Sequence, residues 1–337
     1  LSAARLPESP PSMPHVLHIL TPCFNDAEAL QRLLQELDAV GDGHDLTFHV
    51  VVVDDGSVPP VMINPAILPR WPTILDVTVL HLGANAGHQR ALAVGLAELA
   101  LRPDLELVVV MDSDGEDRPA DIPRLIAEYQ RAPCAAVVAH RAKRSEGLVF
   151  KLGYMMFKLF YRLFTGRAIS FGNFMLLDAS AVGILINRGE LWHSLPGTLL
   201  RARIHHRLLP TERGARYCGT SRMNFAALIL HGLASISVFG DVALVRALIF
   251  TFVLTALAAV GVVGVIGLRL FTPYAIPGWA SSMVLALSII GLQGLLSTMS
   301  LVFILLNGQR GASLIPRLSA ESMISGQHRY GADHDRA

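Results

Sequence analysis

Two long segments without a charged residue, both in the last third of the chain, place the strongest constraint on its fold. Between Arg246 and Arg269 lie about 22 uncharged residues, and Met283–Leu306 adds about 24, where roughly 20 are needed to cross a bilayer core. The chain as a whole agrees, because 52% of its 337 residues are hydrophobic and only 16% are charged. We therefore predict membrane-spanning helices over residues 242–270 and 279–307. The alternative is a buried helical hairpin of a soluble protein.

Arginine residues flank these segments unevenly, which predicts their orientation. Only Arg269 borders the short link between them, whereas other arginines precede the first segment and follow the second: Arg213, Arg216, Arg222, Arg246, Arg310 and Arg317. The positive-inside rule then places both ends of the pair in the cytoplasm. We expect a disordered tail over residues 1–14, a juxtamembrane helix over 223–241, a cytoplasmic tail over 308–337, and a two-span protein of the cytoplasmic (inner) membrane.

The first half of the chain alternates between strand and helix patterns. Between two β-rich runs, Leu30, Leu33, Leu34 and Leu37 recur at the spacing of an amphipathic helix. Further strands and helices follow in the same alternation, with strands over 16–20, 48–53, 77–82, 107–111 and 135–139 and helices over 89–100 and 122–131. Repeated β-α-β units predict an α/β fold, a mostly parallel sheet with helices on both faces, spanning residues 15–222.

Each polar motif of this region follows one of the predicted strands. TPCFND follows the first, DDGS the second, GANAGHQ the third and DSDGED the fourth. Ligands bind at the carboxyl ends of strands in such sheets, so these motifs should meet at one edge. Asp112 and Asp114 offer the hard oxygen ligands that suit Mg²⁺ or Mn²⁺ together with substrate phosphates. The alternative for this stretch alone is a solvated acidic turn.

Other site classes find less support in the sequence. The stretch Gly83–Gly87 lacks the G-x-G-x-x-G and G-K-[ST] patterns of dinucleotide and kinase-type phosphate loops. Cys23, Cys134 and Cys218 lie far apart, which suggests neither a zinc site nor a disulfide framework and fits a reducing cytosolic setting. We expect no nucleic-acid partner.

In this order, TPCFND, VVVDDGS, NAGHQRA and MDSDGEDRP resemble the GT-A nucleotide-sugar glycosyltransferases of family two, in particular the polyprenyl-phosphate branch that includes dolichyl-phosphate mannose synthase and bacterial undecaprenyl-phosphate sugar transferases. The likeness covers about residues 15–310. It departs from the family at Asp26, where Glu is usual, and at GEDRP, which replaces the commoner leucine-glutamine-aspartate-proline-proline. These departures affect the choice of sugar more than the fold.

The resemblance implies a set of site residues. Asp112 and Asp114 would hold the metal ion with the diphosphate, and Asp117 and Glu116 would lie by the sugar as catalytic or hydroxyl-binding groups. The nucleotide sugar, more often UDP-linked than GDP-linked across the family, would bind at Thr21, Pro22, Phe24, Asn25, Asp26, Asp54, Asp55, Gly87, His88, Asp112 and Ser113.

A basic stretch follows the acidic half of the chain. Next to its first arginines and lysines, residues 148–165 form a pattern of cations and aromatics typical of an amphipathic helix in the headgroup plane. By resemblance, this region would receive the lipid phosphate, at Arg141, Arg144 and Lys151. The later RGARYCGTSRM resembles the family's arginine-glycine-serine-lysine stretch, whose Arg213, Ser221 and Arg222 would bind the acceptor phosphate and close over the diphosphate. The alternative is a solvated or merely lipid-attracted basic face.

A phosphate acceptor simplifies the expected chemistry, because a phosphate monoester is already an anionic nucleophile near neutral pH. We expect one in-line displacement at the anomeric carbon with inversion, aided by a cation on the leaving diphosphate. The alternatives are transfer to a hydroxyl-bearing lipid, with Asp117 or Glu116 as base, and a non-catalytic scaffold of an envelope glycosylation or flippase complex. A homo-oligomer, a flippase and a downstream transferase are the expected protein partners.

Overall fold

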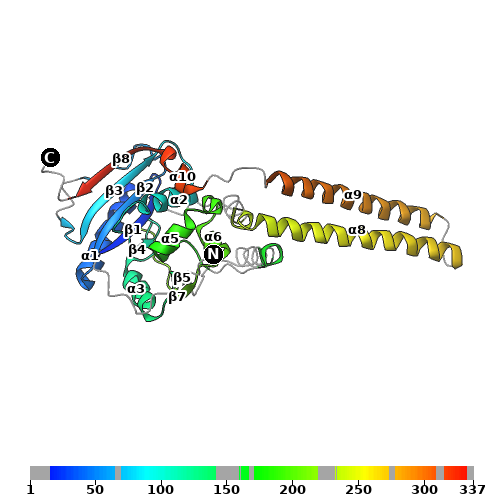
Figure 1. Ribbon diagram of the computed structural model, residues 1–337, viewed down its shortest axis with the longest axis horizontal. Coiled ribbons are helices and arrows are strands. Elements are labelled where there is room, and N and C mark those ends of the chain that lie inside the picture. Colours follow the sequence, from blue (N-terminus) through cyan, green and yellow to red (C-terminus); the bar gives the residue numbers. More distant parts are fainter. Residues whose placement is uncertain are drawn as a thin grey trace. The chain divides into compact units, whose positions relative to one another are not determined.

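The chain forms two units in the computed structural model, which describes residues 16–64, 70–141, 159, 161–166, 171–218, 232, 234–272, 278–308 and 315–331. One unit joins Leu1–Met155, Ile169–Val238 and Leu314–Ala337, and the other joins Met156–Ala168 with Phe239–Ser313. The first unit holds the α/β domain and the second holds two long helices (Figure 1).

The α/β unit is built on a mixed sheet of eight strands in the order β7-β5-β6-β4-β1-β2-β3-β8. The strands are β1 (Val16–Cys23), β2 (Thr47–Asp54), β3 (Ile74–Leu82), β4 (Leu107–Val110), β5 (Ala136–Arg141), β6 (Met175–Asp178), β7 (His206–Thr211) and β8 (Ile324–Gly331). Parallel pairs join β1 to β2 and β4, β2 to β3, and β5 to β7, while β6 and β8 run antiparallel to their neighbours. Six of these eight strands therefore point the same way, as the repeated β-α-β pattern predicts.

Helices cover both faces of this sheet, which confirms the predicted layering. Those of the α/β unit are α1 (Ala27–His44), α2 (His88–Leu99), η2 (Pro119–Asp121), α3 (Ile122–Arg131), α5 (Ala179–Leu185), η3 (Gly189–Trp192), α6 (Leu195–Arg201), α10 (Pro316–Ser319) and η4 (Glu321–Met323). The apolar residues of α1 and α3 pack on one face, and those of α2, α5 and α6 pack on the other.

Side-chain alternation along β2 shows why both faces are covered. Val50 and Val52 belong to the core under α1, whereas Val51 and Val53 belong to the core under α2, and all four are fully buried. Successive strand residues point to opposite faces, so a run of valines can be buried throughout only between two helical layers.

The segment after the long helices returns to the sheet. β8 pairs antiparallel with β3, and its Arg329 binds the buried carboxylate of Asp76 at 2.8 Å. The backbone N–H of Arg317 in α10 donates to the carbonyl of Ile186 at 3.1 Å, next to α5. The red strand β8 lies along the outer side of β3 (Figure 1). The sequence predicted only a tail over 308–337, whereas the structure places residues 316–331 in the α/β unit.

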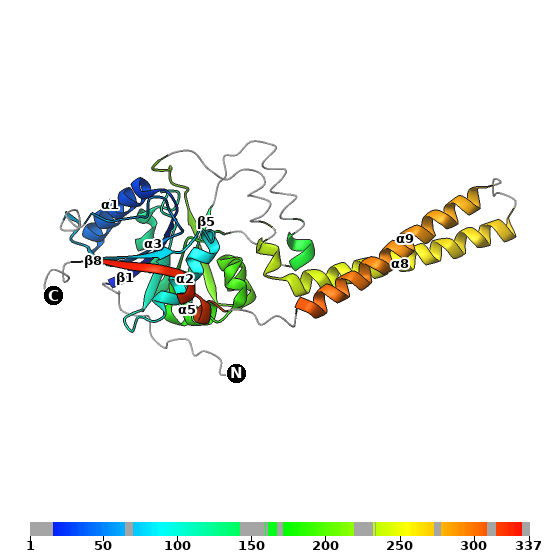
Figure 2. The same cartoon turned by 90° about the horizontal axis from the view of Figure 1, so that it is seen from above.

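The second unit contains α8 (Gly240–Phe271) and α9 (Trp279–Gly308), which are long and apolar enough to cross a membrane. Only 11% and 6% of their most apolar windows are buried, unlike the core helices of a soluble protein. The two helices lie side by side, with Thr298 Oγ1 donating to Thr251 Oγ1 at 3.1 Å (Figures 1 and 2). Small residues bring the backbones close, since a Cβ at Gly294 would lie 2.1 Å from Thr255 Oγ1.

Candidate active site

The predicted motifs meet at one edge of the sheet, because the strands that precede them run in the same direction. The loops after β1, β2, β3 and β4 carry the acidic and polar motifs, and the loop after β7 carries Arg213 and Arg216. Arg141 ends β5, the parallel partner of β7, so its backbone lies at this edge too. The acidic and polar motifs thus lie at one edge of the sheet, the rim, and the structure places Arg213 and Arg216 at that edge with them.

Residues 112–117 fold into a compact acidic loop directly after β4. The amide of Asp112 donates to Asp117 Oδ2 at 3.0 Å, and the amide of Glu116 donates to Asp114 Oδ1 at 2.9 Å. Gly115 adopts φ +87° at the turn, where a Cβ would lie 2.9 Å from the ring of Tyr217. Asp117 is buried and fixes the loop, so its expected contact with the sugar stays a prediction.

Two arginines from the loop after β7 neutralise the acidic loop. Arg216 binds Asp114 Oδ2 through Nη2 at 2.8 Å and Glu116 Oε1 through Nε at 2.8 Å, and Arg213 also binds Glu116 Oε1. Burial by itself would raise the pKa of Glu116, but Arg213 and Arg216 outweigh that effect and lower it. Glu116 is thus ionised and holds both arginines beside the acidic loop. The catalytic role expected for Glu116 stays a prediction.

A row of polar side chains in contact with one another borders the acidic loop at the start of α2. His88 Nε2 lies 3.4 Å from Asp112 Oδ1 and 2.9 Å from Asn173 Nδ2, and Asn173 Oδ1 accepts from Gln89 at 3.1 Å. Burial lowers the pKa of His88 against the opposing charges of Asp117, Asp55 and Asp114, although its side chain keeps 40% exposure at the rim. Neutral His88 can then accept from the amide of Asn173.

Asp54 ties the loops after β2 and β3 together. Its carboxylate accepts from the amides of Ser57 and Val61 at 3.0 Å each and from His81 Nδ1 at 2.9 Å, and the residue is 1% exposed. Burial would raise the pKa of Asp54, but these hydrogen bonds together lower it. Asp54 therefore fixes the loops of the rim from a buried position. The nucleoside contact implied by the resemblance stays a prediction.

Asp55 fastens the start of α2 in the same way. Its oxygens accept from the amide of Ala86 at 2.6 Å and from that of Gly87 at 3.0 Å. These are the backbone donors that a phosphate-binding loop would need to offer. Because the amide of Gly87 is engaged by Asp55, the predicted contact of Gly87 with the nucleotide sugar would have to use an atom other than its amide nitrogen.

The first rim loop is linked to the second through Asn25. The amide of Asn25 donates to Ser57 Oγ and its Oδ1 accepts from the amide of Val58, both at 2.8 Å. The other predicted donor residues lie beside it, with Thr21 and Pro22 at the end of β1, Phe24 exposed, Asp26 at the N-cap of α1 and Ser113 buried in the acidic loop.

Four of the six predicted acceptor residues, Arg144, Lys151, Ser221 and Arg222, lie outside the described residues, as does most of the expected helix over 148–165. The structure adds Arg216, Asn173 and Gln89 to the site. A signal for Arg216 existed in RGARYCGT, but nothing in the sequence distinguishes it from its neighbour Arg213.

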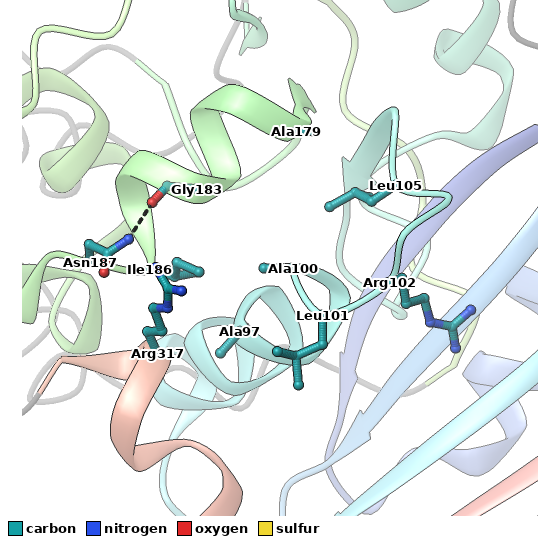
Figure 3. Close-up of a pocket in the computed structure, with 10 residues that line it drawn as sticks. All are labelled: Ala97, Ala100, Leu101, Arg102, Leu105, Ala179, Gly183, Ile186, Asn187 and Arg317. Carbon is teal, nitrogen blue, oxygen red and sulfur yellow. Dashed lines mark hydrogen bonds between the residues drawn. The ribbon is translucent and has the colours of Figure 1, made fainter.

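A described pocket lies at the opposite end of α2 from this rim. Its walls come from the ends of α2 and α5 and from α10, and Asn187 at its border donates to the carbonyl of Gly183 at 2.7 Å (Figure 3). A helix of 12 residues is about 18 Å long, so this pocket is remote from His88 and from the acidic loop.

The chemistry of the acidic loop fits a hard divalent cation. Among the described residues there is no group of three His, Cys, Asp or Glu able to enclose an ion. An Mg²⁺ ion that also binds substrate phosphates commonly needs only one or two protein carboxylates, because the phosphates supply further oxygens. Asp112, with 32% of its side chain exposed, fits as it stands. Asp114 fits only without Arg216, because its two oxygens now bind Arg216 and the amide of Glu116.

Comparison with known proteins identifies the family. The model of glycosyl transferase family 2 matches residues 18–192, more than half of the chain and all of the rim up to the acidic loop. The chain belongs to glycosyl transferase family 2. This confirms the predicted GT-A α/β class and makes the protein a transferase by family.

Relatives and solved structures resemble the family 2 chain over different lengths. It is 26% identical over 292 residues to the uncharacterized glycosyltransferase YkoT of Bacillus subtilis, covering 82% of this chain and 83% of that one. It is also 26% identical over 219 residues to the undecaprenyl-phosphate 4-deoxy-4-formamido-L-arabinose transferase of Pectobacterium atrosepticum, covering 63% of each. A glucosyl-3-phosphoglycerate synthase from Mycobacterium tuberculosis, crystallised with Mn²⁺, UDP and glucosyl-3-phosphoglycerate, aligns over 67% of this chain and 80% of its own at 14% identity and a TM-score of 0.46.

Proposed function

We propose that this protein transfers a sugar from a nucleotide-sugar donor to polyprenyl phosphate at the cytoplasmic face of a membrane. The observation that carries the proposal is the acidic loop 112–117 facing Arg213 and Arg216 at the rim of a family 2 domain. The same chain provides two helices apolar enough to anchor it in the bilayer that contains such a lipid. The named acceptor of the Pectobacterium relative supports this choice of acceptor.

In this proposal the rim binds the donor through its leaving group. Asp112 and Asp114 would hold Mg²⁺ or Mn²⁺, and the ion would supply positive charge to the nucleoside diphosphate leaving group. The second rim loop, fixed by Asp54 and Asn25, provides the wall for the nucleoside. We retain UDP as the expected nucleotide.

The acceptor needs positioning more than activation. Its phosphate loses a second proton near pH 6, so at neutral pH one oxygen is already an anion that can attack. That oxygen forms a bond to the anomeric carbon, while the bond from this carbon to the diphosphate oxygen breaks and the nucleotide leaves with the electron pair. Because the attack is in line, the anomeric configuration inverts. No strong base is required, which agrees with the pairing of Glu116 to arginines.

Chain connectivity supports the proposed membrane topology. The segments before α8 and after α9 both belong to the α/β unit, so a hairpin that enters the membrane must return to the same side. Arginines near the outer ends of the hairpin, such as Arg246 and Arg317, support a cytoplasmic location of that side by the positive-inside rule.

Transfer assays test the proposal directly. The full chain in detergent micelles would be incubated with labelled nucleotide sugars and either undecaprenyl phosphate or undecaprenol, with and without Mg²⁺. We expect Mg²⁺-dependent product with the phosphate alone, and a loss of about 100-fold or more in Asp112→Asn. Asp42→Asn, on the exposed side of α1, serves as the matched control and should keep full transfer. Equal transfer to undecaprenol would replace the acceptor class, and transfer in no arm would refute the enzymatic proposal.

A further inference from the structure

Arg216 forms an ion pair with Asp114, a carboxylate that the proposed cation would need as a ligand. Its guanidinium spans Asp114 Oδ2 and Glu116 Oε1 at 2.8 Å each, and the side chains of both carboxylates are largely buried. The second oxygen of Asp114 accepts from the amide of Glu116 at 2.9 Å. Both oxygens of Asp114 are therefore engaged by the protein itself.

This pairing solves an electrostatic problem of the acidic loop. Four carboxylates lie within six positions, from Asp112 to Asp117, and their mutual repulsion must be neutralised in every state of the enzyme. Arg216 supplies positive charge at Asp114 in this structure. When an ion binds there, Arg216 is both redundant and repelled by it.

We infer that Arg216 is a positioning residue that exchanges partners during donor binding: it leaves Asp114 when a divalent cation arrives and pairs with the diphosphate of the donor. The inference rests on the proposed function, and it assigns Arg216 a role apart from Arg213, which binds Glu116 but not Asp114. A guanidinium group can bind phosphate oxygens as it binds carboxylate oxygens, so the exchange replaces one anion by another.

The backbone allows this side chain to move without loosening the loop. The amide of Gly214 donates to the carbonyl of Glu116, and the amide of Tyr217 donates to the carbonyl of Asp114, both at 2.9 Å. A Cβ at Gly214 would lie 2.1 Å from the carbonyl oxygen of Gly115, so the two loops are in direct backbone contact. These contacts keep the Cα of Arg216 beside the site whichever anion its guanidinium binds.

Two binding measurements on the full chain in detergent micelles test the exchange. The first is titration of Mn²⁺ alone, with free Mn²⁺ followed by electron paramagnetic resonance. Removing the competing guanidinium in Arg216→Ala should tighten the apparent Kd for Mn²⁺ about five-fold. The second is UDP binding at saturating Mn²⁺, by calorimetry, where the same variant should bind about ten-fold more weakly because a bidentate phosphate contact is lost.

Arg213→Ala is the matched control, since it removes the same charge from the same loop without touching Asp114. Its Mn²⁺ affinity should change less than that of Arg216→Ala, because only a through-space effect remains. Arg216→Lys should largely restore competition with Mn²⁺ but not UDP affinity, since an ammonium lacks the bidentate fork. This opposite pair of shifts separates an exchange from a merely structural role.

Three results would overturn the inference: unchanged or weaker Mn²⁺ binding in Arg216→Ala, equal tightening in Arg213→Ala, or unchanged UDP affinity in Arg216→Ala. None of these measurements involves an acceptor lipid. Failure of transfer to undecaprenyl phosphate together with the opposite shifts would refute the proposed acceptor and leave the exchange standing. Normal transfer without the shifts would do the reverse.

Discussion

Asp76 gives the sharpest quantitative test of how the α/β unit is held together. Its buried carboxylate on β3 accepts from His49 Nδ1 of β2 at 2.6 Å and from Arg329 of β8 at 2.8 Å. Burial by itself would raise the pKa of Asp76, but the hydrogen bonds from His49 and Arg329 outweigh it and lower the value from 3.8 to about 2. The folded state therefore favours the ionised form.

The size of the effect follows from that difference. At 1.36 kcal/mol per pH unit, the lowered pKa of Asp76 contributes about 2 kcal/mol to the free energy of unfolding at pH 7. Because the folded pKa is the lower one, this contribution is complete above about pH 4 and is lost as the pH falls towards 2, with about half left at pH 3. Asp76→Asn should thus be less stable than the parent chain by about 2 kcal/mol at pH 7 and by about 1 kcal/mol at pH 3.

Urea denaturation of the full chain in detergent micelles, followed by tryptophan fluorescence, measures both differences. Trp71 is buried just before β3 and reports on this part of the sheet. Arg329→Gln is the comparison variant: its side chain is 56% exposed, so the loss should be less than about 1 kcal/mol. A destabilisation by Asp76→Asn that is equal at pH 7 and pH 3, or smaller than that of Arg329→Gln at pH 7, would refute the reasoning.

Two glycines give further tests of packing. Gly56 has φ +74° and a Cβ there would lie 2.7 Å from the amide nitrogen of Asn85, so Gly56→Ala should lower the free energy of unfolding by about 1–3 kcal/mol, measured by urea denaturation. Gly294→Val should push Thr255 away and weaken the hairpin by a similar amount, about 1–3 kcal/mol. Loss of the circular dichroism signal at 222 nm on heating would show this. Gly264→Val, which meets no atom within 4 Å, is its control, and equal melting of the two would contradict the proposed close packing.

The sequence predicted the elements whose residues carry a local pattern. The spacing of the leucines of α1 predicts an amphipathic helix, and the run of valines in β2 predicts a buried strand; the structure has both. The direction of the strands then brought the motifs to one edge. Such predictions succeed because the period of burial is set by the local backbone geometry.

Elements defined by distant partners were missed. β8 reads ISGQHRYG, with no apolar alternation, and becomes a strand only because β3 offers a free edge about 250 positions earlier in the chain. The clasp of Arg216 on Asp114 likewise joins two loops about 100 positions apart. The sequence placed both carboxylates of DDGS at the rim but could not show that Asp54 and Asp55 face inward to hold its loops.

The return of β8 to the sheet links completion of the α/β unit to formation of the α8–α9 hairpin. The strand that completes the β3 edge follows α9 in the chain, so it is synthesised after both apolar helices. Until then β3 presents unpaired amides and carbonyls, and the carboxylate of Asp76 lacks its arginine. Completion of the sheet thus follows synthesis of the hairpin. A chain whose second apolar helix did not return to the side of the α/β unit would leave the β3 edge without its β8 partner.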